Sequence, residues 1–345
     1  MKNEKVVLKH RPPGVPAADD FRIEQSAVPD IADGEVLVET RFLSLDPYMG
    51  SAVKGRHMSG AIGEGDLMPG DTVGRVVQSR TPDLAEGDIV TARCGWQKYA
   101  VAKARSPELQ GMAAALAPAA DRVEPLAGYP LSLYLGVLGT PGLTAYAGLV
   151  YALEPKPGQT LAVSAASGAV GSAVGQIARN MGVRVVGIAG TDEKCAYVTD
   201  ELGFAACVNR RTNNWGDAVK DACPDGIDRY FDTVGGSTLA IVMRHLAMGA
   251  RITLCGMMEQ YNSEADLGGP SLGPIFGKRA TLNSIVVYDY FDKLPVWRRL
   301  GAQWLQEGRL KTKEDVVVGL DQAPAAFARL MAGENFGKAI VAVSP

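Results

Sequence analysis

The chain has 345 residues, of which 47% are hydrophobic and 21% are charged, and its formal net charge is −3. This length predicts two domains, and the small net charge argues against a nucleic-acid or anionic-membrane partner. No apolar run reaches the roughly 18 residues of a membrane span, and no signal peptide follows Met1, so we expect a cytoplasmic protein.

The cysteines are odd in number and widely scattered along the chain. None forms the C-x-x-C spacing of a zinc knuckle or a redox motif, so we expect reduced and mostly buried thiols. They stand at Cys94, Cys195, Cys207, Cys223 and Cys255.

The first 130 residues have the composition of an all-β domain. Runs rich in β-forming residues at 36–40, 72–77 and 88–92 are separated by turns that contain Gly, Pro and Asp. The helix that we expect in this part is a short one after Ser106. The sequence therefore predicts a β-rich domain over residues 1–130.

From residue 131 the pattern changes to an alternation of strands and helices. A helix is expected at 140–146, and short apolar strands then alternate with helices, which predicts a parallel sheet covered on both faces. The expected strands are 160–164, 184–189, 207–209, 228–232, 249–255 and 280–287, and the expected helices 171–181 and 192–202. The fold class is therefore α/β, with a doubly wound Rossmann domain over residues 131–305.

The C-terminal part returns to β character after an expected helix at 295–306. Strand-like runs at 316–320 and 339–343 flank an expected helix at 324–330. Such strands could pair back onto the first domain, so we expect residues 306–345 to complete it.

A dinucleotide-binding turn is predicted at residues 164–172, SAASGAVGS. It lies between an apolar strand and a helix, whose first N–H groups suit a pyrophosphate. Gly168 lets phosphates approach the backbone, and Gly171 lets the helix pack closely on the sheet. Ala166 stands where the first glycine of G-x-G-x-x-G would be, which is tolerable if that residue needs no positive φ. The alternative is a glycine-rich helix–strand contact without a ligand.

The end of the second strand favours NADP(H) over NAD. An NAD site usually carries an acidic residue there, which binds the ribose 2′-hydroxyl. In this chain the strand is followed by Gly190 without an acid at its tip, and Lys194 in the next helix suits a 2′-phosphate. The alternative is a solvated Lys194 in an ordinary helix N-terminus.

Several stretches resemble one family over almost the whole chain. They are LSLDPYM (43–49), GLTAY (142–146), SAASGAVGSAVGQIAR (164–179), GIDRYFDTVGG (226–236), CGMMEQY (255–261), VYDY (287–290) and ENFGK (334–338). The family is the zinc-independent medium-chain dehydrogenase/reductase group of leukotriene B4 12-hydroxydehydrogenase, or prostaglandin reductase, which includes NADPH-dependent double-bond and curcumin reductases. The resemblance implies a GroES-like catalytic domain beside the Rossmann domain, and a homodimer.

The resemblance also implies a set of cofactor-binding residues. The family's A-x-x-G-x-x-G turn matches Ala165, Gly168 and Gly171, and its 2′-phosphate lysine matches Lys194. The residues implied to bind NADP(H) are Gly168, Ala169, Val170, Gly171, Gly190, Lys194, Arg210, Thr233, Cys255, Gly256, Met257, Tyr261, Ile285, Val286, Val287 and Asn335.

Four places depart from the family pattern. Arg210 replaces a tyrosine and Thr233 an asparagine, while Ser284 and Ile285 replace a Gly-Phe pair. Gly50 replaces an arginine, so an anchor for acidic substrate tails is expected to be missing.

We expect no metal site in this chain. Zinc-dependent relatives carry a G-H-E stretch where this sequence has Gly70-Asp71-Thr72, and His10, His57 and His245 have no ligand-like spacing. Reduction of an activated alkene is the chemistry expected without a metal. Hydride from nicotinamide would add to the β-carbon of an α,β-unsaturated carbonyl, and the enolate would then take a proton.

Tyr261 is the expected proton donor. It follows a strand whose carboxyl end faces the ligand crevice, and similar double-bond reductases use a tyrosine at this place. The alternative is that Tyr261 only shapes the pocket. Tyr48 and Tyr288 are expected to bind substrate, with simple packing as the alternative, and Arg56 and His57 are interpreted as solvated surface residues.

Two other functions stay open at this point. One is an NADPH-dependent quinone reductase of the zeta-crystallin type, against which the DPYM and QYN stretches argue. The other is a catalytically idle NADPH-binding protein. Rates on quinones and on enones would separate these functions from alkene reduction.

Overall fold

The computed structural model describes residues 2–58, 60–106, 111–261 and 269–344. It comprises two compact units, Met1–Gly139 with Glu314–Pro345, and Thr140–Lys313. The sequence places the corresponding boundaries at 130/131 and 305/306, some residues nearer the N-terminus.

Local contacts account for these boundary residues. Leu135 packs with Val73 and Ile340, which keeps the segment that precedes Thr140 in the β-rich unit. Lys311 exchanges two hydrogen bonds with the Gln176 side chain, of 2.7 and 3.0 Å. This exchange keeps the segment after residue 306 in the α/β unit.

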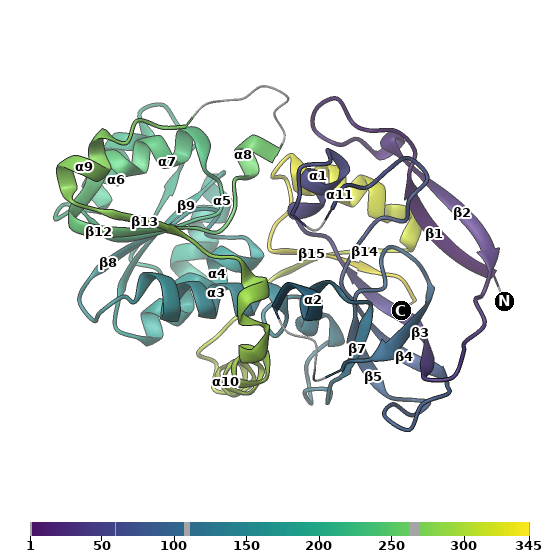
Figure 1. The fold of residues 1–345 in the computed structure, drawn as a ribbon. Coiled ribbons are helices and arrows are strands. Elements are labelled where there is room, and N and C mark those ends of the chain that lie inside the picture. Colours follow the sequence, from purple (N-terminus) through teal and green to yellow (C-terminus); the bar gives the residue numbers. More distant parts are fainter. Residues whose placement is uncertain (1, 59, 107–110, 262–268, 345) are drawn as a thin grey trace. The chain divides into compact units, whose positions relative to one another are not determined.

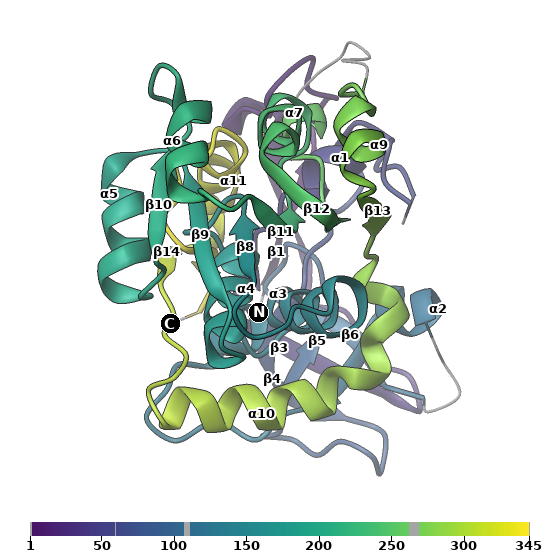
Figure 2. The ribbon, with the colours of Figure 1, turned by 90° about the vertical axis from the view of Figure 1, so that its left-hand side faces the viewer.

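The α/β unit is built around a six-stranded parallel sheet in the order β10-β9-β8-β11-β12-β13, which Figure 2 shows from left to right. The strands are β8 (Thr160–Val163), β9 (Arg184–Ala189), β10 (Ala206–Asn209), β11 (Ile227–Asp232), β12 (Leu246–Leu254) and β13 (Thr281–Ser284). The direction of strand addition reverses beside β8, and α/β sheets bind ligands at the carboxyl end of such a reversal. The predicted α/β class is confirmed.

Helices cover both faces of this sheet, as Figure 1 shows. One face carries α3 (Thr140–Ala147) and α4 (Ala169–Asn180), and the other carries α6 (Trp215–Ala222) and α7 (Gly236–Val242). The unit also contains α5 (Asp192–Ala196), α8 (Met258–Tyr261), α9 (Gly273–Lys278) and α10 (Leu294–Gln306). Apolar side chains from strands, α6 and α7 share one core, which includes Val186, Val219, Tyr230, Leu239 and Ile252.

Two of the predicted elements in this unit have different lengths. The helix expected at 192–202 is the short α5, followed by a π-helical segment at Tyr197–Glu201. The strand expected at 280–287 ends at Ser284, and a 3-10 helix occupies Val287–Lys293. β13 is the edge strand and pairs only with β12, so the sheet supports it on one side.

The β-rich unit contains a seven-stranded sheet in the order β14-β15-β3-β4-β5-β7-β6, in which β6 also pairs with β3. This extra pairing closes β3, β4, β5, β7 and β6 into a barrel. The strands are β3 (Glu35–Ser44), β4 (Thr72–Ser79), β5 (Ile89–Ala92), β6 (Tyr99–Ala104), β7 (Ala119–Arg122), β14 (Glu314–Val318) and β15 (Lys338–Ala342). Val36, Val38, Val76, Val90 and Ala100 lie among the residues of its core.

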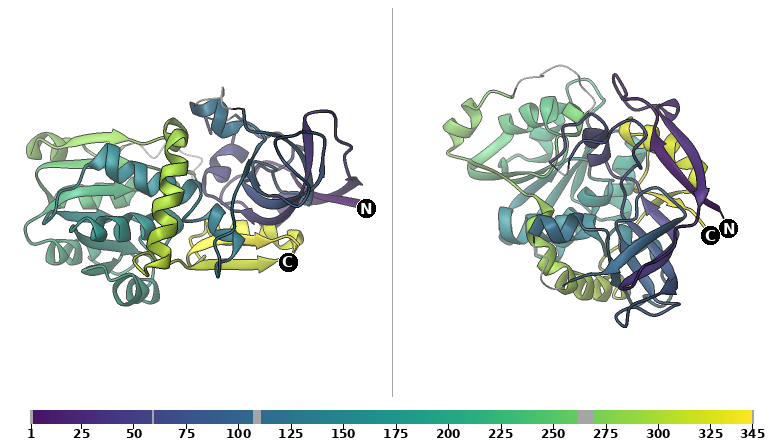
Figure 3. Two further views of the ribbon diagram at one scale, coloured as in Figure 1. Left: turned by 90° about the horizontal axis from the view of Figure 1, so that it is seen from below. Right: turned by 45° about the vertical axis from the view of Figure 1, so that its right-hand side comes forward.

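The C-terminal residues return to the β-rich unit, as the yellow segment in Figure 3 shows. β15 pairs antiparallel with β3, and β14 pairs parallel with β15. Helix α11 (Ala323–Met331) packs Phe327 against Trp96 and Phe21, with ring centroids 5.6 and 5.9 Å apart. The first unit is therefore discontinuous in sequence.

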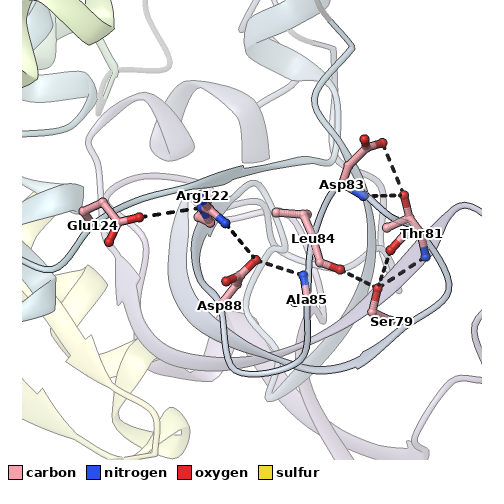
Figure 4. A network of polar contacts seen from close by, with 8 residues as sticks. All are labelled: Ser79, Thr81, Asp83, Leu84, Ala85, Asp88, Arg122 and Glu124. Atoms are coloured by element: carbon pink, nitrogen blue, oxygen red, sulfur yellow. Dashed lines mark hydrogen bonds and ion pairs between the residues drawn. The ribbon is translucent and has the colours of Figure 1, made fainter.

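The connection from β4 to β5 is fastened by its own polar groups, which Figure 4 shows. Ser79 Oγ donates to the carbonyl oxygen of Leu84 at 2.6 Å, and Asp88 accepts the N–H of Ala85 at 2.9 Å. Arg122, at the end of β7, lies 3.8 Å from Asp88. These contacts link the turn to the barrel.

The sequence analysis missed several elements of the β-rich unit. They are β1 (Lys2–Leu8), β2 (Phe21–Ala27), β6, β7 and α1 (Tyr48–Val53), whereas α2 (Gly111–Leu116) is the short helix expected after Ser106. β6 and β7 are rich in alanine, which has a low strand propensity, and their neighbours in the barrel supply the stabilisation. β2 is mostly exposed, so it lacks the apolar alternation that marks a strand.

Candidate active site

The predicted cofactor residues of the α/β unit lie at the carboxyl edge of its parallel sheet. Residues 164–171 follow β8, Gly190 and Lys194 follow β9, and Arg210 follows β10. Thr233, Cys255 to Tyr261, and Ile285 to Val287 follow β11, β12 and β13. Because all six strands are parallel, these segments come together at one edge.

The turn after β8 has its left-handed residue at Ala165. Ala165 has a φ of 47°, whereas Ala166, at the place of the missing glycine, has no positive φ. Ala166 is buried, and its N–H donates to the Ile188 carbonyl oxygen of β9 at 3.0 Å. The condition under which alanine is tolerable at 166 is therefore met, and the conformation that favours glycine falls one residue earlier.

Gly171 is the residue that permits the tight turn. A Cβ atom at this position would lie 2.4 Å from the Ala165 carbonyl oxygen, closer than real Cβ atoms approach. Gly168 is the N-cap of α4, in extended conformation, and its own N–H donates to the Ala165 carbonyl oxygen at 2.8 Å. The turn therefore brings the N-terminus of α4 against the end of β8.

The N-terminus of α4 has the properties of an anion site. The helix has 12 residues and no acidic residue in its first turn. The first N–H groups of a helix lack partners within the helix and carry a partial positive charge. Ala169 and Val170, in this first turn, are only partly buried. These features suit a pyrophosphate.

Basic residues gather around the end of β9. A Cβ atom on Gly190 would lie 3.6 Å from Nε of Arg211, so this guanidinium lies beside Gly190. Arg210 is exposed, and its N–H donates to the Ala189 carbonyl oxygen at 2.9 Å. Sequence reasoning named Lys194 and Arg210 but missed Arg211. Two consecutive arginines directly after a strand of the Rossmann sheet were the available signal.

The acidic residue nearest to this strand end is already engaged. The Asp192 carboxylate accepts a hydrogen bond from Nδ2 of Asn209 at 2.8 Å. The N-cap of α5 is the Thr191 hydroxyl, which accepts the Lys194 N–H at 3.2 Å. Asp192 thus lies in the first turn of α5, beyond the tip of β9 where an NAD site usually carries its acidic residue.

A buried hydrogen-bond network joins the ends of β8 and β11. Ser164 Oγ donates to Asp232 at 2.8 Å and accepts the Thr233 N–H at 2.8 Å. Burial raises the pKa of Asp232, and hydrogen bonds from the N–H groups of Val234 and Gly235 oppose that rise. The network holds Thr233 at the strand end, although its side chain differs from the family's asparagine.

Tyr261 lies over the end of β12. A Cβ atom on Gly256 would lie 3.5 Å from the Tyr261 hydroxyl and 3.2 Å from the Thr233 carbonyl oxygen. Burial raises the pKa of Tyr261, a hydrogen bond with the Met257 backbone opposes this rise, and Cys255 adds to it. The phenol is thus protonated at neutral pH. Burial also raises the pKa of Cys255 to about 12, so its thiol is unreactive.

The segment after β13 is anchored to β12. The Ile285 N–H donates to the Leu254 carbonyl oxygen at 2.9 Å, and the Ile285 side chain is buried. Val286 and Val287 are partly buried, and Tyr288 is buried with its ring 6.3 Å from that of Phe291. Within the α/β unit, Tyr288 is therefore a packed residue.

In the β-rich unit, Tyr48 begins α1 and is surrounded by polar side chains. Arg93 donates to the Tyr48 hydroxyl at 3.1 Å, and the His57 ring lies 5.0 Å from the Tyr48 ring. The interpretation of His57 as a solvated surface residue is wrong, because its half-buried ring packs at a tilt against the Tyr48 ring, whereas Arg56 is exposed. Asn335, also in this unit, donates to the Gly337 carbonyl oxygen at 2.8 Å.

A buried ion pair fixes the segment that leads into Tyr48. Lys338 of β15 is 5% exposed, and its Nζ lies 2.7 Å from both an Asp46 carboxylate oxygen and the Leu45 carbonyl oxygen. Ser44 also donates to Asp46. Residues of the LSLDPYM and ENFGK stretches, almost 300 positions apart, therefore meet in one contact.

Two kinds of feature are absent from the described residues. No group of three or more His, Cys, Asp or Glu side chains in the described ranges could hold a metal ion. Among the helices that the structure describes, none combines the length and the apolar character of a bilayer span.

Comparisons with known proteins find similarity over the whole chain. Residues 4–109 match the family model described as N-terminal domain of oxidoreductase, and residues 169–302 match zinc-binding dehydrogenase. NADPH-dependent curcumin reductase of Escherichia coli (strain K12) is 38% identical over 99% of this chain and 97% of that protein. Prostaglandin reductase 1 of Bos taurus is 40% identical over 97% of each chain. The crystal structure of CurA from Vibrio vulnificus in complex with NADPH has a TM-score of 0.89 and 36% identity over 99% of both chains.

Proposed function

This chain belongs to the medium-chain dehydrogenase/reductase family that includes curcumin reductase, prostaglandin reductase 1 and 2-alkenal reductase, and on that premise we propose that it reduces the C=C bond of α,β-unsaturated ketones and aldehydes with NADPH. The observation that carries the proposal is the carboxyl edge of the parallel sheet. There, free helix N–H groups, basic side chains and a protonated tyrosine follow consecutive strand ends.

The residues at this edge fit a dinucleotide with a 2′-phosphate. The N–H groups at the start of α4 would hold the pyrophosphate, and Gly171 keeps this turn tight, because a Cβ atom there would meet the Ala165 carbonyl oxygen. Lys194, Arg210 and Arg211 would hold the 2′-phosphate beside Gly190. Thr233, residues 255–257 and 285–287, and Asn335 complete the proposed contacts.

NADPH, when bound, supplies the hydride that adds to the β-carbon of the enone. The residues of the protein must then handle the charge that moves to the carbonyl oxygen and the proton that the α-carbon takes. Tyr261 is the proposed proton donor, because its hydroxyl lies at the strand end beside Gly256. Tyr48 and Tyr288 are proposed to bind the substrate.

The raised pKa of Tyr261 fits this role and gives a pH dependence. An ordinary tyrosine loses its proton near pH 10, and burial moves the Tyr261 pKa above that value. Because the reaction needs the protonated phenol, kcat should not fall through loss of this proton until the pH exceeds 10. A pH–rate profile with a saturating enone measures this, and an alkaline limb near pH 8 would assign the proton to another group.

The test of the activity is NADPH oxidation at 340 nm with a panel of enals, enones and 1,4-quinones. Turnover of enones with retention of the carbonyl in the product supports the proposal. Faster turnover of quinones would favour a quinone reductase, and tight NADPH binding without any turnover would favour an idle binding protein.

Replacement of Tyr261 by Phe tests the donor. General-acid catalysis typically contributes about 100-fold or more to a rate, so we expect kcat to fall by about that factor while NADPH affinity stays unchanged. Tyr197→Phe is the matched control, since Tyr197 is another partly buried tyrosine of this unit, whose pKa burial raises to about 12. Unchanged turnover in Tyr261→Phe would remove it as donor.

We also propose that the reaction needs no zinc, that the protein is cytoplasmic and that it forms a homodimer. The small number of histidines and the Gly70-Asp71-Thr72 stretch support the first statement. The five free cysteines agree with a reducing compartment. The homodimer is proposed from the resemblance to the family, and sedimentation measurements would test it. Full activity after treatment with a metal chelator would support a reaction without zinc.

A further inference from the structure

Arg93, directly beyond β5, makes a direct polar contact with Tyr48. Its Nη2 donates to the Tyr48 hydroxyl at 3.1 Å, and its guanidinium carbon lies 5.4 Å from the centre of the Tyr48 ring. The Arg93 side chain is only 14% exposed, and its Nη1 lies 3.8 Å from Asp71. The guanidinium is thus held in place between the phenol and a carboxylate.

The sequence analysis expected no cation at the position that follows Tyr48 and Met49, because Gly50 stands there. The family's arginine directly follows the tyrosine-methionine pair, at the place of Gly50. In the structure Gly50 is buried, and a Cβ atom there would lie 2.3 Å from Cε of Met331 in α11. Met331 therefore occupies the space that a side chain at position 50 would need, and Arg93 is the arginine that bonds to the Tyr48 hydroxyl.

The direction of the Arg93–Tyr48 hydrogen bond decides what the phenol can do. A guanidinium has only donors, so the Tyr48 oxygen must accept this bond and its hydrogen points away from Arg93. A hydroxyl whose oxygen accepts a charge-assisted bond becomes a stronger donor itself, because hydrogen bonds in a chain polarise one another. Arg93 therefore prepares Tyr48 to donate to an oxygen that gains negative charge.

Three titratable side chains lie close to the Arg93–Tyr48 pair. Burial lowers the pKa of His57, and the charge of Arg93 lowers it further, so the ring that packs against Tyr48 is neutral at pH 7. An Asp71 carboxylate oxygen lies 3.8 Å from Arg93. The carboxylate of Asp46, two residues before Tyr48, is bound to Lys338 at 2.7 Å.

We propose that Arg93 is a positioning residue, which orients and polarises the Tyr48 hydroxyl so that this hydroxyl binds the carbonyl oxygen of the enone. The proposal rests on the proposed function and adds a residue to it. As hydride reaches the β-carbon, the C=C electron pair moves to form the enolate, and the Tyr48 O–H bonds to its oxygen without losing the proton. The α-carbon takes its proton from the general acid of the enzyme, which solvent reprotonates.

The kinetic test is a double-mutant cycle of Arg93→Met and Tyr48→Phe. We expect Arg93→Met to lower kcat by about tenfold or more, with a KM change of less than about threefold, because the lost bond matters most when the oxygen is charged. In the Tyr48→Phe background the same change should have almost no effect. Equal losses in both backgrounds would overturn the proposal.

A second measurement does not depend on enone turnover. The ultraviolet titration of Tyr48 is obtained in each background as the difference between the protein with Tyr48 and the same protein with Tyr48→Phe. The midpoint of this titration should shift upward by about one pH unit in Arg93→Met, because a nearby cation stabilises the phenolate. An unshifted titration would overturn the proposal. If the wild type reduces no enone but Arg93→Met still shifts the titration of Tyr48, the proposed function is refuted and the Arg93–Tyr48 coupling stays in place.

Two further variants separate this role from a general effect on folding. Arg93→Lys keeps the charge but loses the planar fork, so we expect it to restore part of kcat and most of the phenol shift. Arg105→Met removes a comparable arginine of the same unit, which pairs with Asp121 at 2.7 Å. If Arg105→Met lowers kcat as much as Arg93→Met does, the effect is structural and the proposal fails.

Discussion

In the α/β unit the proposed cofactor contacts come mainly from the backbone at strand ends, whereas in the β-rich unit Tyr48 depends on side chains from separate segments. The turn from Ala165 to Gly171 is continuous, and its shape follows from local conformation and one close approach. Tyr48 meets Arg93, His57 and, through the Asp46 segment, Lys338. A site made of backbone groups tolerates most changes of nearby side chains, but not an added atom that displaces the backbone. A site made of side chains loses its contacts when one of those side chains is replaced.

The largest effect is expected where the β-rich unit depends on one buried side chain. Lys338→Met would leave Asp46, which is 19% exposed, without its cation and should lower the free energy of unfolding by about 3 kcal/mol or more. Urea unfolding measures it. The control Lys311→Met breaks an exposed pair with Glu201 and should cost less than about 1 kcal/mol. A similar small loss in both variants would mean that Tyr48's segment does not depend on Lys338.

The next effect concerns side chains in the cofactor region of the α/β unit. Lys194→Ala should raise the KM for NADPH by about 10- to 100-fold, the cost of one charge-assisted hydrogen bond, with little change for NADH. Arg211→Ala should act in the same direction. Lys278→Ala, on α9, is the control with no expected change. Equal effects of Lys194→Ala on both coenzymes would refute the 2′-phosphate assignment.

Gly171→Ala tests the backbone site by adding one carbon atom. The added Cβ meets the Ala165 carbonyl oxygen, so the turn must shift, at a cost of about 1–3 kcal/mol in unfolding free energy. We also expect NADPH to bind at least about tenfold more weakly, measured by calorimetry. Gly277→Ala makes the same change in α9, where a Cβ atom has no neighbour within 4 Å among the described residues, and should leave binding unchanged. Normal NADPH affinity in Gly171→Ala would show that the turn is not a backbone cradle.

The smallest expected effect is a gain. Ala165→Gly should stabilise the protein by about 1 kcal/mol or less, because glycine adopts the φ of 47° without the steric cost that alanine bears. Ala178→Gly, inside α4, should instead destabilise by at least about 1 kcal/mol. Loss of stability in Ala165→Gly would mean that its methyl group contributes more by packing than its conformation costs.

The sequence was most informative where structure is local. The alternation of short apolar strands with helices predicted the parallel sheet, and the strand–turn–helix context predicted the start of α4 within two residues. The barrel strands β6 and β7 were missed, because alanine-rich segments become strands only through neighbours that are distant in sequence. Arg211 was missed and His57 was misinterpreted for a related reason. The role of each depends on a neighbour, Gly190 or Tyr48, that the sequence alone does not place beside it.

By itself, the sequence determined the α/β class, the place of the dinucleotide turn and the family to which the chain belongs, because these depend on periodicity and on contiguous motifs. The tertiary structure decided that Ala165 rather than Ala166 is left-handed, that Met331 fills the space beside Gly50, and that Arg93 reaches the Tyr48 hydroxyl. Contacts of this kind join residues that lie from 45 to almost 300 positions apart in the sequence. Their energy depends on distances between atoms in the folded chain, and no local pattern of the sequence encodes those distances.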